Sequence, residues 1–148
     1  MTLALLRLLE HIHGHLGWLA VAALLHPAII LRRPTRRAPL AVSLATGLVL
    51  LTGALGATVY PDYRVRLKQN IFLEAPTLGW CFERKEHLAV FAISFACIGC
   101  LLHLTTPRFT EPLRPAIAKT AHRAYVGAFA MALMTAILGI AVAVHSTF

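Results

Sequence analysis

Four long apolar stretches, separated by shorter polar segments, make up most of the chain. They cover approximately residues 12–31, 40–60, 87–106 and 124–144, and none of them contains Lys, Arg, Asp or Glu. At 1.5 Å of rise per helical residue, each is long enough to cross about 30 Å of hydrocarbon. Including their flanks, the pattern predicts helices at about 3–31, 40–60, 84–106 and 116–146. The predicted fold class is therefore all-α, a single domain over 1–148 that forms an integral membrane four-helix bundle.

Prolines mark the expected helix boundaries. Pro34 and Pro39 bracket the first connection, and Pro61 is expected to end the second helix. The one long connection, residues 61–86, carries several aromatic side chains, which predicts an amphipathic segment lying in the membrane interface.

Composition agrees with a membrane protein, and charge predicts its orientation. Apolar residues make up 58% of the 148 residues, and the mean hydropathy is +0.71. The first and third connections hold one acid, Glu111, against eight cations: Arg32, Arg33, Arg36, Arg37, Arg108, Arg114, Lys119 and Arg123. The opposite side is nearly balanced, so the positive-inside rule places the basic connections in the cytoplasm and both termini outside a bacterial inner membrane. We attribute the pI near 10.3 to this topology and to contact with the anionic lipid bilayer, and expect no nucleic-acid partner.

A weak internal repeat is also visible. Glu10-His11 in the first helix matches Glu86-His87 in the third, and a Thr-x-x-Leu-Gly pattern beginning at Thr52 recurs at Thr135. A tandem duplication of a two-helix unit is one interpretation; chance similarity between apolar sequences is the other.

Eight histidines in a chain with few other polar residues require an explanation. They form two layers: His11, His13, His15, His87 and His145 on the outer side, and His26, His103 and His122 on the inner side. A histidine within a membrane needs partners for both ring nitrogens, and a haem iron can satisfy one of them. Haem b, a large apolar disc, suits a four-helix core that lacks carboxylates, so the pattern predicts one or two haems b as cofactor.

His11 and His87 form the best outer pair, because both stand at matching depth near the outer ends of their helices. His15 lies one turn from His11 and is an alternative ligand. Nearby cations, among them Arg64 and Arg84, are candidates to bind the haem propionates. The competing interpretation is that the clustered histidines of the first helix are ordinary interfacial polar residues.

A second haem would use the inner layer. His26 lies about 22 Å along the helix from His11, and its partner would be His122 or, if the third helix is distorted, His103. Alternatively, His26 relieves the backbone polarity that Pro27 creates at a kink.

The run from His11 to Trp18, HIHGHLGW, followed by Pro27 and an Arg pair, resembles the first helix of the bacterial membrane protoporphyrinogen IX oxidases and the related copper-resistance-D-like membrane proteins. The resemblance covers mainly the first and third helices, about a third of the chain. It implies a small multi-helix haem protein. His87 stands where the oxidase family has a lysine, and this departure favours an electron-transfer haem with two histidine ligands over the oxidase.

These features predict a membrane b-type cytochrome, or a subunit of one, that passes electrons through one or two bis-His haems. Its expected partners are a quinone and other membrane or periplasmic redox subunits. Two alternatives stay open: a haem-dependent porphyrinogen-oxidising enzyme in which Glu10 or Glu86 accepts the proton, and a cofactor-free accessory subunit of a larger membrane complex.

Overall fold

The computed structural model describes residues 2–145, and that range contains helices but no strand. The long helices are α1 (Leu3–Ile30), α2 (Pro39–Tyr63), α4 (Pro76–Thr105) and α5 (Leu113–His145). The π-helical turn η1 (Arg64–Lys68) and α3 (Gln69–Glu74) join α2 to α4, and the 3-10 turn η2 (Thr106–Arg108) follows α4. Within the described range, four helical stretches are long and apolar enough to cross a membrane. The predicted all-α membrane bundle is confirmed.

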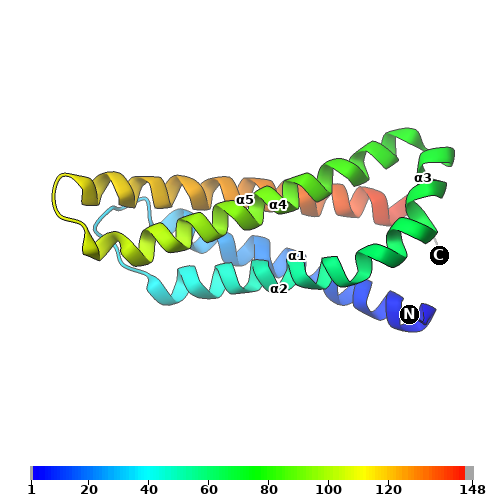
Figure 1. Cartoon of the computed structure of the whole chain (residues 1–148), viewed down its shortest axis with the longest axis horizontal. Helices are drawn as coiled ribbons and strands as arrows, with labels where there is room; N and C mark the ends of the chain where they lie inside the picture. Colours follow the sequence, from blue (N-terminus) through cyan, green and yellow to red (C-terminus); the bar gives the residue numbers. More distant parts are fainter. Residues whose placement is uncertain (1, 146–148) are drawn as a thin grey trace.

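The four long helices alternate in direction (Figure 1). The start of α1, the end of α5 and the whole of α3 lie at one end of the molecule, which we call the terminal end. The connections 31–38 and 106–112 lie at the other end, which we call the turn end. Helices α1 and α4 each pack against both α2 and α5. The helices that the sequence repeat matches, α1 with α4 and α2 with α5, are therefore the diagonal pairs of the bundle.

The connection expected over 61–86 is mostly helical. Helix α2 continues through Pro61 to Tyr63, so the prediction that Pro61 ends it is wrong. Helix α4 begins at Pro76 instead of near 84, because Pro76 occupies the first turn, where its missing N–H costs nothing, and Ala75 before it is non-helical. Helix α5 likewise begins at Leu113 instead of 116, and its expected end at 146 lies outside the described residues.

The apolar core occupies the turn half of the bundle. Its buried side chains come from all four long helices: Ala20, Leu24, Ala28, Leu31, Val42, Ala45, Val49, Ala96, Tyr125 and Ala128. Most are small, which lets the helix backbones approach closely, as in other membrane bundles.

Tyr125 ties three helices together inside this core. Its hydroxyl donates to the carbonyl of Val42 at 3.0 Å and lies 2.9 Å from the hydroxyl of Thr46. Thr46 in turn donates to the carbonyl of Ala96 at 3.3 Å. A Cβ on Gly99 would lie 2.9 Å from the Tyr125 ring, so glycine is needed where that ring crosses α4. The buried hydroxyls thus have partners, and the core at this level is filled.

Candidate functional site: an ionisable cluster in the core

The buried positions of α1 recur every seven residues and continue into its N-terminal half. Leu31 and Leu24 are buried, and the same series reaches Glu10. A second series runs from Ala20 to His13 and on to Leu6, which is buried again. Glu10 and His13 thus occupy positions that face the neighbouring helices in a seven-residue pattern.

On α4 and α2, the buried series also change from apolar residues to ionisable or phenolic ones. On α4, the series that includes buried Ala92 continues to Lys85, and on α2 the series of Val42 and Val49 continues to Tyr63. Core positions that are apolar in the turn half therefore hold ionisable or phenolic groups in the terminal half. We call Glu10, His13, Tyr63 and Lys85 the ionisable cluster.

Contacts between three helices hold this cluster together. The Tyr63 hydroxyl donates to the Glu10 carboxylate, joining α2 to α1. The Tyr63 ring stacks on the buried ring of Phe82 from α4, with centroids 5.8 Å apart. The Lys85 ammonium lies 4.5 Å from the centroid of Phe82 and 5.7 Å from that of Tyr63, within the range of a cation–π interaction.

His13 is held against α2. Its Nδ1 lies 3.1 Å from the backbone carbonyl of Thr52. Since a carbonyl only accepts, Nδ1 must carry the proton, and Nε2 is then the unprotonated nitrogen of the neutral ring. A Cβ on Gly56 would lie 2.9 Å from Cε1 of His13, so the ring fits because position 56 is glycine.

The cluster is electrostatically coupled and lies near the edge of the hydrocarbon. His13 interacts with both Glu10 and Lys85, and Lys85 also interacts with Glu86. His13 stands 17 residues from Ile30, the last residue of α1, which is about 26 Å of helical rise in a layer about 30 Å thick. Charges inside a membrane are costly unless paired, which makes this cluster the candidate functional site.

Surface ion pairs surround the cluster at the terminal end. Lys68 in η1 pairs with Glu83 of α4, and Arg66 pairs with Asp62 at 3.3 Å. Hydrogen bonding to Glu83 raises the pKa of Lys68. Arg64 and Arg84, the candidates to bind propionates, are exposed on η1 and α4 at this same end.

The predicted outer ligands lie away from the core. His11, His15 and His87 are exposed, and the core of α1 receives His13 instead. Nδ1 of His87 lies 2.8 Å from the carbonyl of Glu83. Because His87 is two residues, about 200°, from Lys85, it projects from the opposite side of α4. The structure therefore does not bring His11 and His87 together across the bundle.

The inner histidines have separate surroundings. His103 is buried, and its Nε2 accepts from the backbone N–H of Ala38 at 3.1 Å, which fixes the start of α2 against α4. That nitrogen is therefore already occupied. His26 is exposed beside the buried Pro27. His122 is partly buried, and its Nδ1 is the one buried side-chain N or O atom in the described range without a hydrogen-bond partner.

No group of three or more His, Cys, Asp or Glu side chains in the described range is arranged to hold a metal ion. Comparison of the chain with protein-family models, with curated proteins and with solved structures finds no match. The functional interpretation accordingly rests on the side chains themselves.

Proposed function

We propose that this chain is a small b-type cytochrome subunit of the bacterial cytoplasmic membrane that passes electrons between a quinone and a partner on its outer face. The ionisable cluster carries this proposal. In a bundle whose buried positions are mostly apolar, a histidine, a carboxylate and an ammonium group lie together between the helices of one half. Such groups inside a membrane generally mark a site where a cofactor, a proton or a substrate is handled.

The residues of the cluster suit haem b. His13 would hold the iron through Nε2, since Nδ1 is engaged by the Thr52 carbonyl, an arrangement that is usual for metal-binding histidines. Lys85 offers a cation for a propionate, and the exposed Arg64 and Arg84 offer further cations at the rim. When bound, the haem would supply a one-electron iron centre. His87 would reach an iron only at the outside of the bundle, where a neighbouring subunit could share it.

The proposal retains the orientation that the charges predict. The turn end, with its excess of arginine, would face the cytoplasm, and the ionisable cluster would lie near the outer surface. Electrons would then leave towards a partner on the outer face. The second haem, at His26 with His122 or His103, stays a prediction. The unpartnered Nδ1 of His122 supports a ligand there, whereas the occupied Nε2 of His103 favours His122 over His103.

The three histidines of the HIHGH run provide a matched test. We expect purified His13→Ala to lose most of its haem, measured as pyridine haemochrome per polypeptide and as the reduced-minus-oxidised spectrum. His11→Ala and His15→Ala lie on the same helix within two residues but are exposed, so they should keep the wild-type content. Loss of haem in His11→Ala with retention in His13→Ala would contradict the site. A wild-type protein that is colourless even after reconstitution with haemin would favour the accessory subunit.

The contact between Glu10 and Tyr63 favours one second candidate. A carboxylate held inside the bundle close to Lys85 is suited to accept a proton from a substrate that is being oxidised, as the porphyrinogen-oxidising alternative requires. The assay follows the porphyrin fluorescence that develops when protoporphyrinogen is added with quinone as the electron acceptor. A rate that falls in Glu10→Gln but not in Glu74→Gln would support the enzyme. Equal rates in both variants would exclude a role for Glu10.

A further inference from the structure

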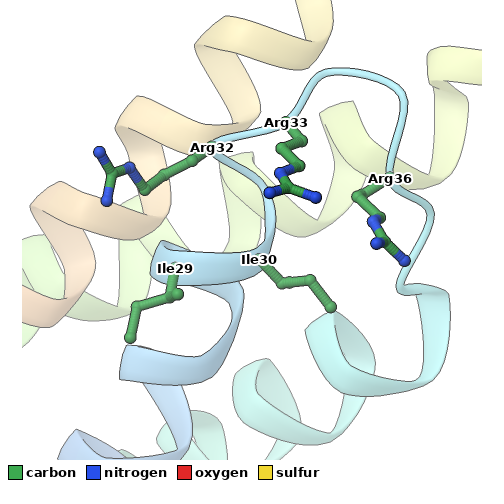
Figure 2. Close-up of a pocket in the computed structure, with 5 residues that line it drawn as sticks. All are labelled: Ile29, Ile30, Arg32, Arg33 and Arg36. Atoms are coloured by element: carbon green, nitrogen blue, oxygen red, sulfur yellow. The ribbon is translucent and has the colours of Figure 1, made fainter.

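A cationic groove surrounds the last turn of α1 at the turn end. It has a volume of about 690 Å³ and is lined by Ile29, Ile30, Arg32, Arg33 and Arg36. Figure 2 shows Arg33 at the connection, Arg36 beside the start of α2 and Arg32 directed to the other side of the helix end, with the two isoleucines on the last turn of α1 below them. No residue of the ionisable cluster and no predicted histidine ligand lines the groove, although Arg36 also lines the neighbouring cavity that contains His103.

The three arginines have no acidic partner within the described part of the chain. The two ion pairs found there, Arg66 with Asp62 and Lys68 with Glu83, both lie at the terminal end. Backbone hydrogen bonds from Arg32 to Ile29 and from Arg36 to Arg33 hold the connection in tight turns, so the three arginines stand on one short, ordered segment. Like charges on one short segment repel, so a bound anion would stabilise this arrangement.

The apolar part of the groove indicates the kind of anion. Ile29 is 58% exposed, and the membrane-spanning stretch of α1 ends at Ile30, so the arginines begin where the hydrocarbon is expected to end. Phosphate groups of phospholipids lie at this depth, with their acyl chains alongside the residues below. Guanidinium groups bind phosphate oxygens in pairs, and they do so more specifically than ammonium groups.

We propose that this groove is a binding site for an anionic phospholipid with two phosphodiester groups, that is, a lipid of the cardiolipin class. Two phosphates match a set of three unpaired cations better than the single charge of phosphatidylglycerol. The volume lies within the roughly 300–1,000 Å³ of ordinary ligand sites and so accommodates a headgroup instead of a lone ion. Ile29 and Ile30 would contact the acyl chains, which distinguishes a lipid from free phosphate.

The test measures lipid retained by the full-length protein in neutral detergent, by native mass spectrometry. The probes are cardiolipin, phosphatidylglycerol and phosphatidylcholine. We expect Arg33→Gln combined with Arg36→Gln to lower cardiolipin retention on the order of tenfold. The control combines Arg37→Gln with Arg108→Gln, which removes the same charge from the same end but outside the groove, and it should retain cardiolipin within about twofold of wild type.

Three results would overturn the proposal. Equal losses in the groove and control variants would show a general charge effect. Equal retention of phosphatidylcholine would show binding without headgroup recognition. Displacement of cardiolipin by millimolar inorganic phosphate would show that the anion alone is recognised. Replacing Arg33 and Arg36 with lysine sharpens the assignment: paired phosphate contacts predict partial loss, whereas attraction by charge alone predicts none. Haem content should be unchanged in all these variants, so the result is independent of the proposed function.

Discussion

The two halves of the bundle use the same helices and the same seven-residue pattern of core positions for different purposes. In the turn half these positions hold alanine, valine, leucine and the hydrogen-bonded Tyr125. In the terminal half they include the ionisable cluster, where Glu10, His13 and Lys85 interact beside the stacked rings of Tyr63 and Phe82. Packing requirements alone would fill both halves alike. This difference supports the proposal that the turn half mainly stabilises the fold and that the terminal half holds the functional site.

The largest expected effect separates the two halves by stability. Tyr125→Ala should destabilise the protein by about 3–5 kcal/mol, because it removes a fully buried ring and leaves the hydroxyl of Thr46 and the carbonyl of Val42 without this partner. Tyr63→Ala, which removes the same side chain from the other half, should cost clearly less because Tyr63 is only partly buried. Reversible unfolding in mixed micelles of dodecylmaltoside and SDS measures both. Equal costs would mean that the terminal half is also a packing core.

A second prediction tests whether the ionisable cluster is retained for function. Glu10→Leu alone should destabilise the protein by roughly 1–3 kcal/mol, because it leaves the Tyr63 hydroxyl without its acceptor and the Lys85 ammonium with Glu86 as its remaining counter-charge. The double variant Glu10→Leu with Lys85→Leu should regain wild-type stability or exceed it, since apolar residues often replace a buried pair without loss. Stability is measured by the same unfolding in mixed micelles. The haem content of the double variant should fall. A double variant less stable than Glu10→Leu would instead make the pair structural.

A third, smaller effect concerns the packing of the His13 ring against Gly56. Gly56→Ala would place a methyl group 2.9 Å from Cε1 of a ring that the Thr52 carbonyl holds in place. We expect a loss of about 1–2 kcal/mol together with reduced haem content, because the ring must turn away. Gly47→Ala is the matched control: no atom lies within 4 Å of the added carbon, and alanine favours the helix by about 0.5–1 kcal/mol. Unchanged haem content in Gly56→Ala would show that this contact does not orient the ligand.

Much of this architecture could be predicted from the sequence, because the membrane requires long apolar stretches and they are easily counted. The ends of the helices are harder to predict from the sequence. Pro61 was expected to end α2, but α2 continues for two further residues and passes directly into η1, so that proline marks no boundary. Helix α4 begins at Pro76, well before the uncharged stretch from which its start was predicted, because Pro76 is accommodated in the first turn.

The sequence does not show which histidine of α1 faces the core. Depth along the helix does not distinguish His11, His13 and His15, and depth was the basis for pairing His11 with His87. In steps of seven residues, His11 aligns with Ala4 and Trp18, His13 with Leu6 and Ala20, and His15 with Leu8 and Ala22, so all three series are apolar. The burial of Leu6 and Ala20 in the structure shows that the series of His13 is the one that faces the core. No such spacing reveals the hydrogen bond from the Ala38 N–H to His103, because it depends on how a connection folds over the end of α4.

The smallest expected effect lies at the surface of the terminal end and depends on pH. The ion pair with Glu83 raises the pKa of Lys68, so its contribution is fully present below the ordinary lysine pKa of about 10.4 and is lost as the pH rises through the higher folded-state value. The pair is partly exposed to water, and such pairs contribute about 0–1 kcal/mol. The free energy of unfolding, measured between pH 8 and pH 11, should therefore fall slightly more steeply with rising pH for wild type than for Lys68→Gln. Haem content should be the same in both, because Lys68 lies outside the ionisable cluster. Parallel pH profiles would show that the pair contributes nothing to stability, and a loss of haem in Lys68→Gln would extend the functional region of the terminal half to its surface.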